Sequence, residues 1–99
     1  MDVERTEAEN RQYRRELFIK LLLMLRAGAL QQLGQLTNPI TGEKKVDMEL
    51  ARETIDMLDL IREKTAGNLS EPENEMINNL ISEMQVAYVE VSTKGADEI

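Results

Sequence analysis

The chain has 99 residues and a formal net charge of −7, with 41% hydrophobic and 3% aromatic residues. A chain of this length forms one small domain, and here Leu, Ile and Met must supply an aliphatic core. The chain contains no cysteine and no histidine, which excludes disulfides, thiolate metal sites and nucleophiles activated by histidine.

The negative charge is concentrated in the last third of the chain. Residues 1–36 carry six basic and five acidic residues (+1), residues 37–69 carry five and seven (−2), and residues 70–99 carry one and seven (−6). Phosphate backbones require clustered basic residues, so we expect no nucleic-acid partner. No apolar run reaches the roughly 20 residues of a membrane span, so we expect no membrane partner and a cytoplasmic location.

Apolar residues at helical spacing predict a first helix over about residues 7–36. Its first turns lie within a polar, partly disordered N-terminal segment over residues 1–12. On a helical wheel its apolar residues form two stripes. The broad stripe is expected to pack on the rest of the chain, and it consists of Phe18, Leu21, Leu22, Leu25, Ala29, Leu33 and Leu36.

The second, narrower stripe of this helix is left without an intramolecular partner. Soluble domains rarely leave a long apolar stripe uncovered, so we predict a homodimer; the alternative is that both stripes belong to one intramolecular core. Gly28, in mid-helix, costs about 1 kcal/mol relative to Ala, and either the close approach of another helix or a kink would account for it. The predicted interface residues are Ile19, Leu23, Ala27 and Leu30.

A connection from Thr37 to Val46 contains the turn-forming residues Pro39 and Gly42. A second helix is predicted over about residues 47–66. Asp47 can accept hydrogen bonds from its first turn, and Gly67 supplies the left-handed residue after its last turn.

The run Ser70-Glu71-Pro72-Glu73 has the spacing of a capping box, in which Ser70 and Glu73 satisfy each other's backbone N–H groups. It predicts a third helix over residues 71–91, antiparallel to the second, followed by a disordered tail over residues 92–99. The fold class is therefore all-α: a long first helix plus a helical hairpin, forming one domain over residues 13–91 and a dimeric helical bundle.

Acidic pairs on helices are the remaining catalytic material. Glu4-x-x-Glu7 and Glu53-x-x-Asp56 match the two halves of the Mg²⁺ site of all-α nucleotide-processing enzymes, in which several carboxylates converge on the metal. The competing interpretation is a solvated charged face. We favour a non-enzymatic interaction or assembly module without metal or cofactor, and keep the Mg²⁺ enzyme with Glu53 and Asp56 as the alternative.

Most distinctive residues between Thr37 and Ser70 have a structural reason, because they turn the chain or begin and end a helix. Four polar residues in this stretch lack such a reason. If the stretch holds a site, we expect it among Asn38, Thr54, Lys64 and Asn68.

Several motifs in this region resemble the small family known as domain of unknown function 1844. The resemblance implies a short, helical, cytoplasmic bacterial protein without assigned activity, and it implies no catalytic residues. It is carried by Pro39-x-Thr41-Gly42-Glu43, Val46-Asp47-x-Glu49-Leu50-Ala51, Thr54-Ile55-Asp56-x-Leu58, Glu63-Lys64-Thr65-x-Gly67-Asn68-Leu69 and Tyr88-Val89-Glu90.

Overall fold

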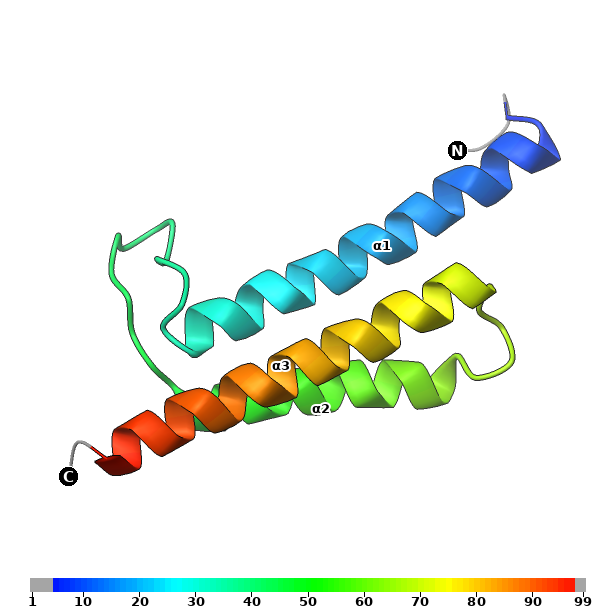
Figure 1. Cartoon of the computed structure of the whole chain (residues 1–99). Coiled ribbons are helices and arrows are strands. Elements are labelled where there is room, and N and C mark those ends of the chain that lie inside the picture. The colour runs from blue at the N-terminus through cyan, green and yellow to red at the C-terminus, as the bar shows by residue number, and fades with distance from the viewer. Residues whose placement is uncertain (1–4, 98–99) are drawn as a thin grey trace.

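The computed structural model describes residues 5–97, which form three α-helices (Figure 1). They are α1 (Glu7–Gln32), α2 (Met48–Lys64) and α3 (Glu71–Asp97). Within these residues there is no strand, only an isolated antiparallel bridge between Leu33 and Val46. The predicted all-α fold, with a long first helix and a helical hairpin, is confirmed.

The helices lie side by side in a flat arrangement. α2 runs antiparallel to α1 and α3, which are parallel to each other, and the first turns of α1 project beyond the start of α3 (Figure 1). The molecule measures 57 × 31 × 16 Å, and its radius of gyration is 16.3 Å, against about 13 Å for a compact domain of this length. The core is therefore shallow.

One face of each helix supplies the core. Its centre is aliphatic and draws on all three helices, with Phe18, Leu25, Ile61 and Tyr88 packed at its edge. A smaller cluster joins Leu33 to α2 and α3 where α1 ends. The buried side chains of the main cluster are Leu22, Ala29, Leu30, Ile55, Leu58, Ile77, Leu80, Ile81 and Met84.

The predicted helix starts are confirmed by their hydrogen bonds. The Asp47 carboxylate accepts from the Leu50 N–H at 3.0 Å. The backbone N–H of Ser70 donates to Glu73 Oε1 at 2.8 Å, and the Glu73 N–H donates to Ser70 Oγ at 3.3 Å. The left-handed residue predicted after α2 is also present, since Gly67 has φ +86°.

The first helix ends earlier than predicted. α1 stops at Gln32 instead of residue 36, because Gly34 turns the chain with φ +75° and Leu33 pairs with Val46. The Asp47 N–H donates to the Gln32 carbonyl at 2.7 Å. This bond ties the end of α1 to the start of α2, and the apolar spacing that continues to residue 36 is not helical.

The predicted start of the first helix near residue 7 is confirmed, because α1 begins at Glu7, after a capping box formed by Thr6 and Glu9; the spacing Thr-x-x-Glu signals this start. The predicted disordered tail is corrected where the structure describes it. α3 continues to Asp97, so residues 92–97, which were expected in the tail, are helical. Residues 1–4 and 98–99 lie outside the described part.

Candidate functional site

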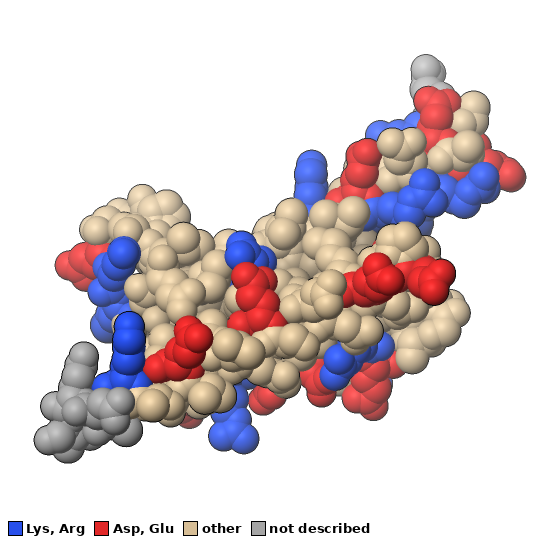
Figure 2. Space-filling model, viewed as in Figure 1, with Lys and Arg blue, Asp and Glu red and all other residues tan. Residues whose placement is uncertain are grey.

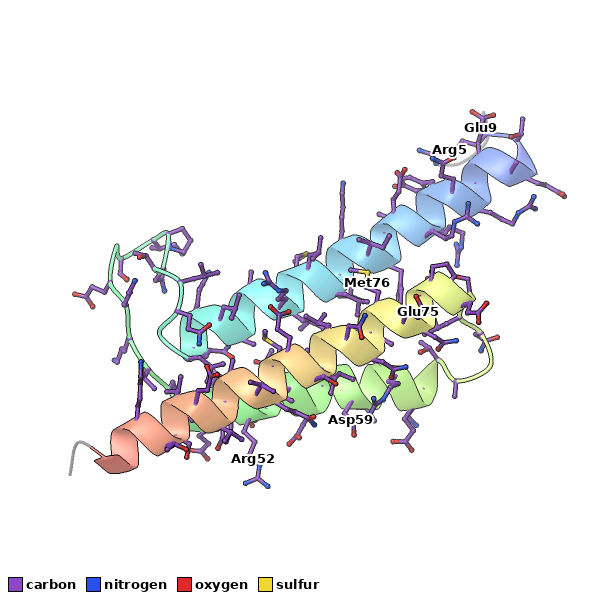
Figure 3. All side chains as sticks on the ribbon, in the orientation of Figure 1. Arg5, Glu9, Arg52, Asp59, Glu75 and Met76 are labelled. Carbon is purple, nitrogen blue, oxygen red and sulfur yellow. The ribbon has the colours of Figure 1, made fainter. Side chains whose placement is uncertain are left out.

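Among the described side chains, one ion pair with fork geometry joins α1 to α3. Arg26 Nε donates to Glu83 Oε1 at 3.0 Å, and Arg26 Nη2 donates to Glu83 Oε2 at 2.8 Å. These hydrogen bonds raise the pKa of Arg26 and hold the pKa of Glu83 below its usual range. Ile19 and Met76, separated by the same 57 residues in sequence, line a hollow on the same seam, and Figure 3 shows Met76 between the two helices.

This α1–α3 contact corrects one of the predicted interface residues. Leu30 is only 8% exposed and belongs to the intramolecular core, because α3 covers the flank of α1 that carries the narrow apolar stripe. Ile19 and Ala27 are half-buried, and Leu23 remains 48% exposed. Leu30 is therefore not available to a second subunit. The structure does not test the other three, and the dimer proposed below uses the opposite flank of α1 instead.

A hydrogen bond at the buried side chain of Thr54 joins α1 to α2. Thr54 is 6% exposed, and its hydroxyl donates to the Leu50 carbonyl at 3.1 Å. The Gln32 amide, in the orientation that satisfies its neighbours, donates to Thr54 Oγ1 at 2.7 Å and also reaches the Gly28 carbonyl at 3.3 Å. Thr54 thus has a structural reason: it holds the end of α1 against α2.

Of the other three candidate polar residues, two have a structural role and the third, Asn68, lines a groove. Asn38 Oδ1 accepts from the N–H groups of Ile40 and Thr41 at 2.8 and 3.3 Å, so Asn38 closes the turn in the connection. Lys64 is an exposed residue in the last turn of α2, where a positive charge complements the helix dipole. Asn68 is exposed and lines a groove at the other end of the molecule.

Large apolar side chains remain exposed along one side of α1 and α2. On the helical wheel those of α1 lie on the side that carries Gln32, next to α2, and those of α2 lie on the outer side of the same seam. Met24 is the most exposed of them at 70%. We call this surface the α1–α2 face, and it consists of Leu17, Leu21, Met24, Leu50, Met57 and Leu60.

Gly28 lies on the same side of α1 as Leu21 and Met24, and α1 continues through it without interruption. A Cβ added at Gly28 would meet only the tip of the Gln32 side chain, at 4.0 Å. No close intramolecular contact therefore requires glycine at this position, in contrast to Gly34, where an added Cβ would lie 2.8 Å from Val46 Cγ2.

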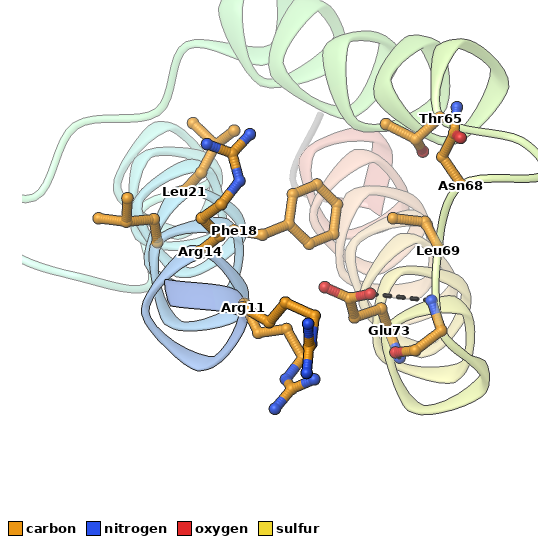
Figure 4. A pocket seen from close by; sticks show the side chains of 11 residues that line it. Arg11, Arg14, Phe18, Leu21, Thr65, Asn68, Leu69 and Glu73 are labelled. Carbon is orange, nitrogen blue, oxygen red and sulfur yellow. Dashed lines mark hydrogen bonds between the residues drawn. The ribbon is translucent and has the colours of Figure 1, made fainter. Parts of the chain in front are cut away.

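A groove of about 650 Å³ lies where the projecting end of α1 passes the turn between α2 and α3 (Figure 4). Its floor is apolar, and Phe18 points into it. Arg11, Arg14 and Arg15 form its rim on α1, and they are exposed. We call it the arginine-rimmed groove; its remaining lining residues are Leu17, Leu21, Thr65, Asn68, Leu69, Ser70 and Glu73.

The carboxylates of the alternative Mg²⁺ site do not converge. Glu53 and Asp56 are exposed on α2, and the hollow that Asp56 borders brings Arg52 beside it but no second carboxylate. Among the side chains that the structure describes, no three of Asp, Glu, His or Cys are grouped so that they could hold a metal ion. Glu4 lies outside the described residues.

Charged side chains of both signs cover the projecting part of α1, whereas uncharged surface dominates the middle of the molecule in the same view (Figure 2).

None of the helices in the described part of the chain is long and apolar enough to cross a membrane.

The chain matches a known protein family. The model of the family described as "Domain of unknown function (DUF1844)" matches residues 16–90, which include most of α1, all of α2 and α3 as far as Glu90. No curated protein and no solved structure matches the chain.

Proposed function

The chain belongs to the DUF1844 family, and we propose that it is a non-enzymatic assembly module that forms a homodimer by packing its α1–α2 face against a second copy. The family description assigns no activity, so the proposal rests on the surface of this chain. The observation that carries it is the α1–α2 face itself, where six large apolar side chains from two adjacent helices are exposed.

The surface area supports a partner of substantial size. The chain exposes 7451 Å², whereas a compact monomer of its mass exposes about 5,700 Å². The projecting end of α1 accounts for part of the difference of about 1,700 Å². A stable interface buries about 800 Å² on each partner, so a second copy can cover the α1–α2 face and still leave the ends of the helices exposed.

Gly28 favours a helix as the element that covers this face. Glycine in mid-helix costs about 1 kcal/mol relative to Ala, and no close contact within the chain offsets this cost. A helix crossing over Gly28 would approach the backbone of α1 closely, with Leu21 and Met24 packing beside it. In a two-fold dimer the same residues of both copies meet, so one such crossing of α1 on α1 serves both subunits.

The test is the molar mass in solution, measured by light scattering after size exclusion over a range of protein concentrations. We expect the wild-type chain to have twice its monomer mass at micromolar concentration. Met24→Asp should reduce it to the monomer mass, because a carboxylate in the centre of the apolar face is left without water or a partner. Val86→Asp is the matched control, since Val86 is an apolar residue on α3 that is also more than half exposed, at 58% against 70% for Met24.

A third variant tests which flank of α1 forms the dimer interface. Leu23→Asp changes the flank next to α3, which also holds Ile19 and Ala27, and we expect it to leave the dimer intact. A wild-type chain that is monomeric at all concentrations would overturn the proposal. A dimer that Leu23→Asp dissociates and Met24→Asp does not would show that the α1–α2 face is the wrong surface.

A further inference from the structure

We propose that the arginine-rimmed groove binds an acidic amphipathic helix of a partner protein. This goes beyond the proposed homodimer, because the groove accepts a different protein. Its floor shares Leu17 and Leu21 with the α1–α2 face, so a second copy and the partner helix compete for this part of α1. The observation behind it is the combination of three exposed arginines with an apolar floor between α1 and the start of α3.

The arginines of the rim are available to an external anion. Neither a hydrogen bond nor an ion pair engages Arg11, Arg14 or Arg15 in the described part of the chain. The one carboxylate of the groove, that of Glu73, already accepts the N–H of Ser70 at 2.8 Å. The groove therefore has a net positive charge and unused guanidinium donors, which bind carboxylates in fork geometry.

The positive charge of α1 is confined to a short stretch of the helix, and it therefore favours a ligand small enough to contact the groove alone. Residues 11–26 contain five basic residues and one acidic residue, although the whole chain carries −7. Charges farther away than about 8 Å are screened at physiological salt. A ligand that stays on the groove is thus attracted, whereas an extended anionic surface such as a membrane or a nucleic acid would also meet the acidic remainder of the chain.

The apolar floor favours an amphipathic helix over a simple anion. Leu17 and Leu21 are about half-exposed there, and Phe18 and Leu69 are half-buried. The groove is open along α1, whose first turns project beyond the start of α3 and have no neighbouring helix (Figure 1). A helix lying beside this part of α1 would place apolar residues on the floor and its acidic residues at the rim, as in other helix-in-groove complexes.

The probe is a synthetic amphipathic helical peptide of Leu, Ala and Glu, about 18 residues long so that it can form a helix, with a second peptide in which Gln replaces every Glu. Binding to the full chain is measured by fluorescence anisotropy of the labelled peptide. We expect saturable binding of the acidic peptide with a Kd below about 1 mM, at least about tenfold weaker binding of the Gln peptide, and weakening with added salt.

Two charge reversals locate the site. Arg14→Glu should weaken binding of the acidic peptide at least about tenfold, which corresponds to about 1.4 kcal/mol. Arg52→Glu is the matched control, because Arg52 is an exposed arginine that projects from α2 away from α1 (Figure 3), and binding should change less than twofold. The helix content of both variants, measured by circular dichroism, should equal that of the wild type.

The outcomes distinguish this inference from the homodimer. Arg14→Glu should keep the molar mass of the wild type. The monomeric Met24→Asp chain should bind the acidic peptide at least as tightly as the wild type, because no second copy covers its Leu17 and Leu21. The inference is overturned if the two peptides bind equally, if the two charge reversals have equal effects, or if Met24→Asp abolishes peptide binding. It is also overturned if binding does not saturate at about 1 mM peptide, a concentration at which the expected complex is more than half formed.

Discussion

Replacing Leu30 with Ala tests which flank of α1 belongs to the intramolecular core. Leu30 is 8% exposed, so nearly all of its side chain is removed from water on folding. The substitution deletes three carbon atoms, worth about 0.8 kcal/mol each in transfer free energy, and leaves a cavity. We expect a loss of about 3 kcal/mol, a large share of the 5–15 kcal/mol that stabilises domains of this kind.

Leu23→Ala is the comparison for this measurement, because it deletes the same atoms from a side chain that is 48% exposed. The Leu23 side chain buries about half as much of its surface as the Leu30 side chain, and its removal leaves no closed cavity, so the expected loss of stability is about 1 kcal/mol. Urea unfolding followed by circular dichroism gives both values, at one protein concentration for all variants, because dimerisation makes the apparent stability depend on concentration. Equal costs, or a larger cost at Leu23, would refute the assignment of Leu30 to the core.

Three further effects on stability are expected. A double-mutant cycle with Arg26→Ala and Glu83→Ala should give a coupling free energy of about 0.2–1 kcal/mol at pH 7, since both side chains are partly solvated. Because the pKa of Glu83 is lowered in the folded state, this coupling is complete above the unfolded-state pKa of Glu83 and should vanish as the pH falls through its folded-state pKa. A coupling that persists at the acid end of the titration contradicts the ion pair. Ser70→Ala should cost about 1 kcal/mol in urea unfolding by removing the cap of α3, and Ser70→Asp, which retains a cap, should cost less. Gly34→Ala should lower the thermal midpoint, because φ is +75° and the new Cβ would lie 2.8 Å from Val46 Cγ2; an unchanged midpoint would show that the turn relaxes freely.

The helices and their starts could be predicted from sequence because each signal acts within one turn. Asp47 and Ser70 satisfy N–H groups only three residues away, and Gly67 needs only its own backbone conformation. The Thr6–Glu9 box is equally local and could have been recognised by the same spacing. The end of α1 was misplaced because apolar spacing continued to Leu36, whereas the turn at Gly34 depends on the distant residue Val46.

The candidate surfaces were decided by the tertiary structure. Periodicity shows that α1 has more apolar surface than one neighbour can cover, but it does not show how two neighbours divide that surface. α3 covers the flank with Leu30, and α2 leaves Met24 exposed on the other flank. The wheel position of a residue is fixed by the sequence, whereas its burial depends on where the other helices cross.

The sequence by itself determined that this protein is an all-α chain, with caps that begin the second and third helices, and without the side chains of histidine- or cysteine-dependent chemistry. Only the tertiary structure brought Arg14 of α1 to the same groove as Asn68 and Leu69, and only it assigned Thr54 to a contact with Gln32. The physical reason is distance along the chain: caps and amphipathic faces arise from residues a few positions apart, whereas these surfaces join residues separated by whole helices.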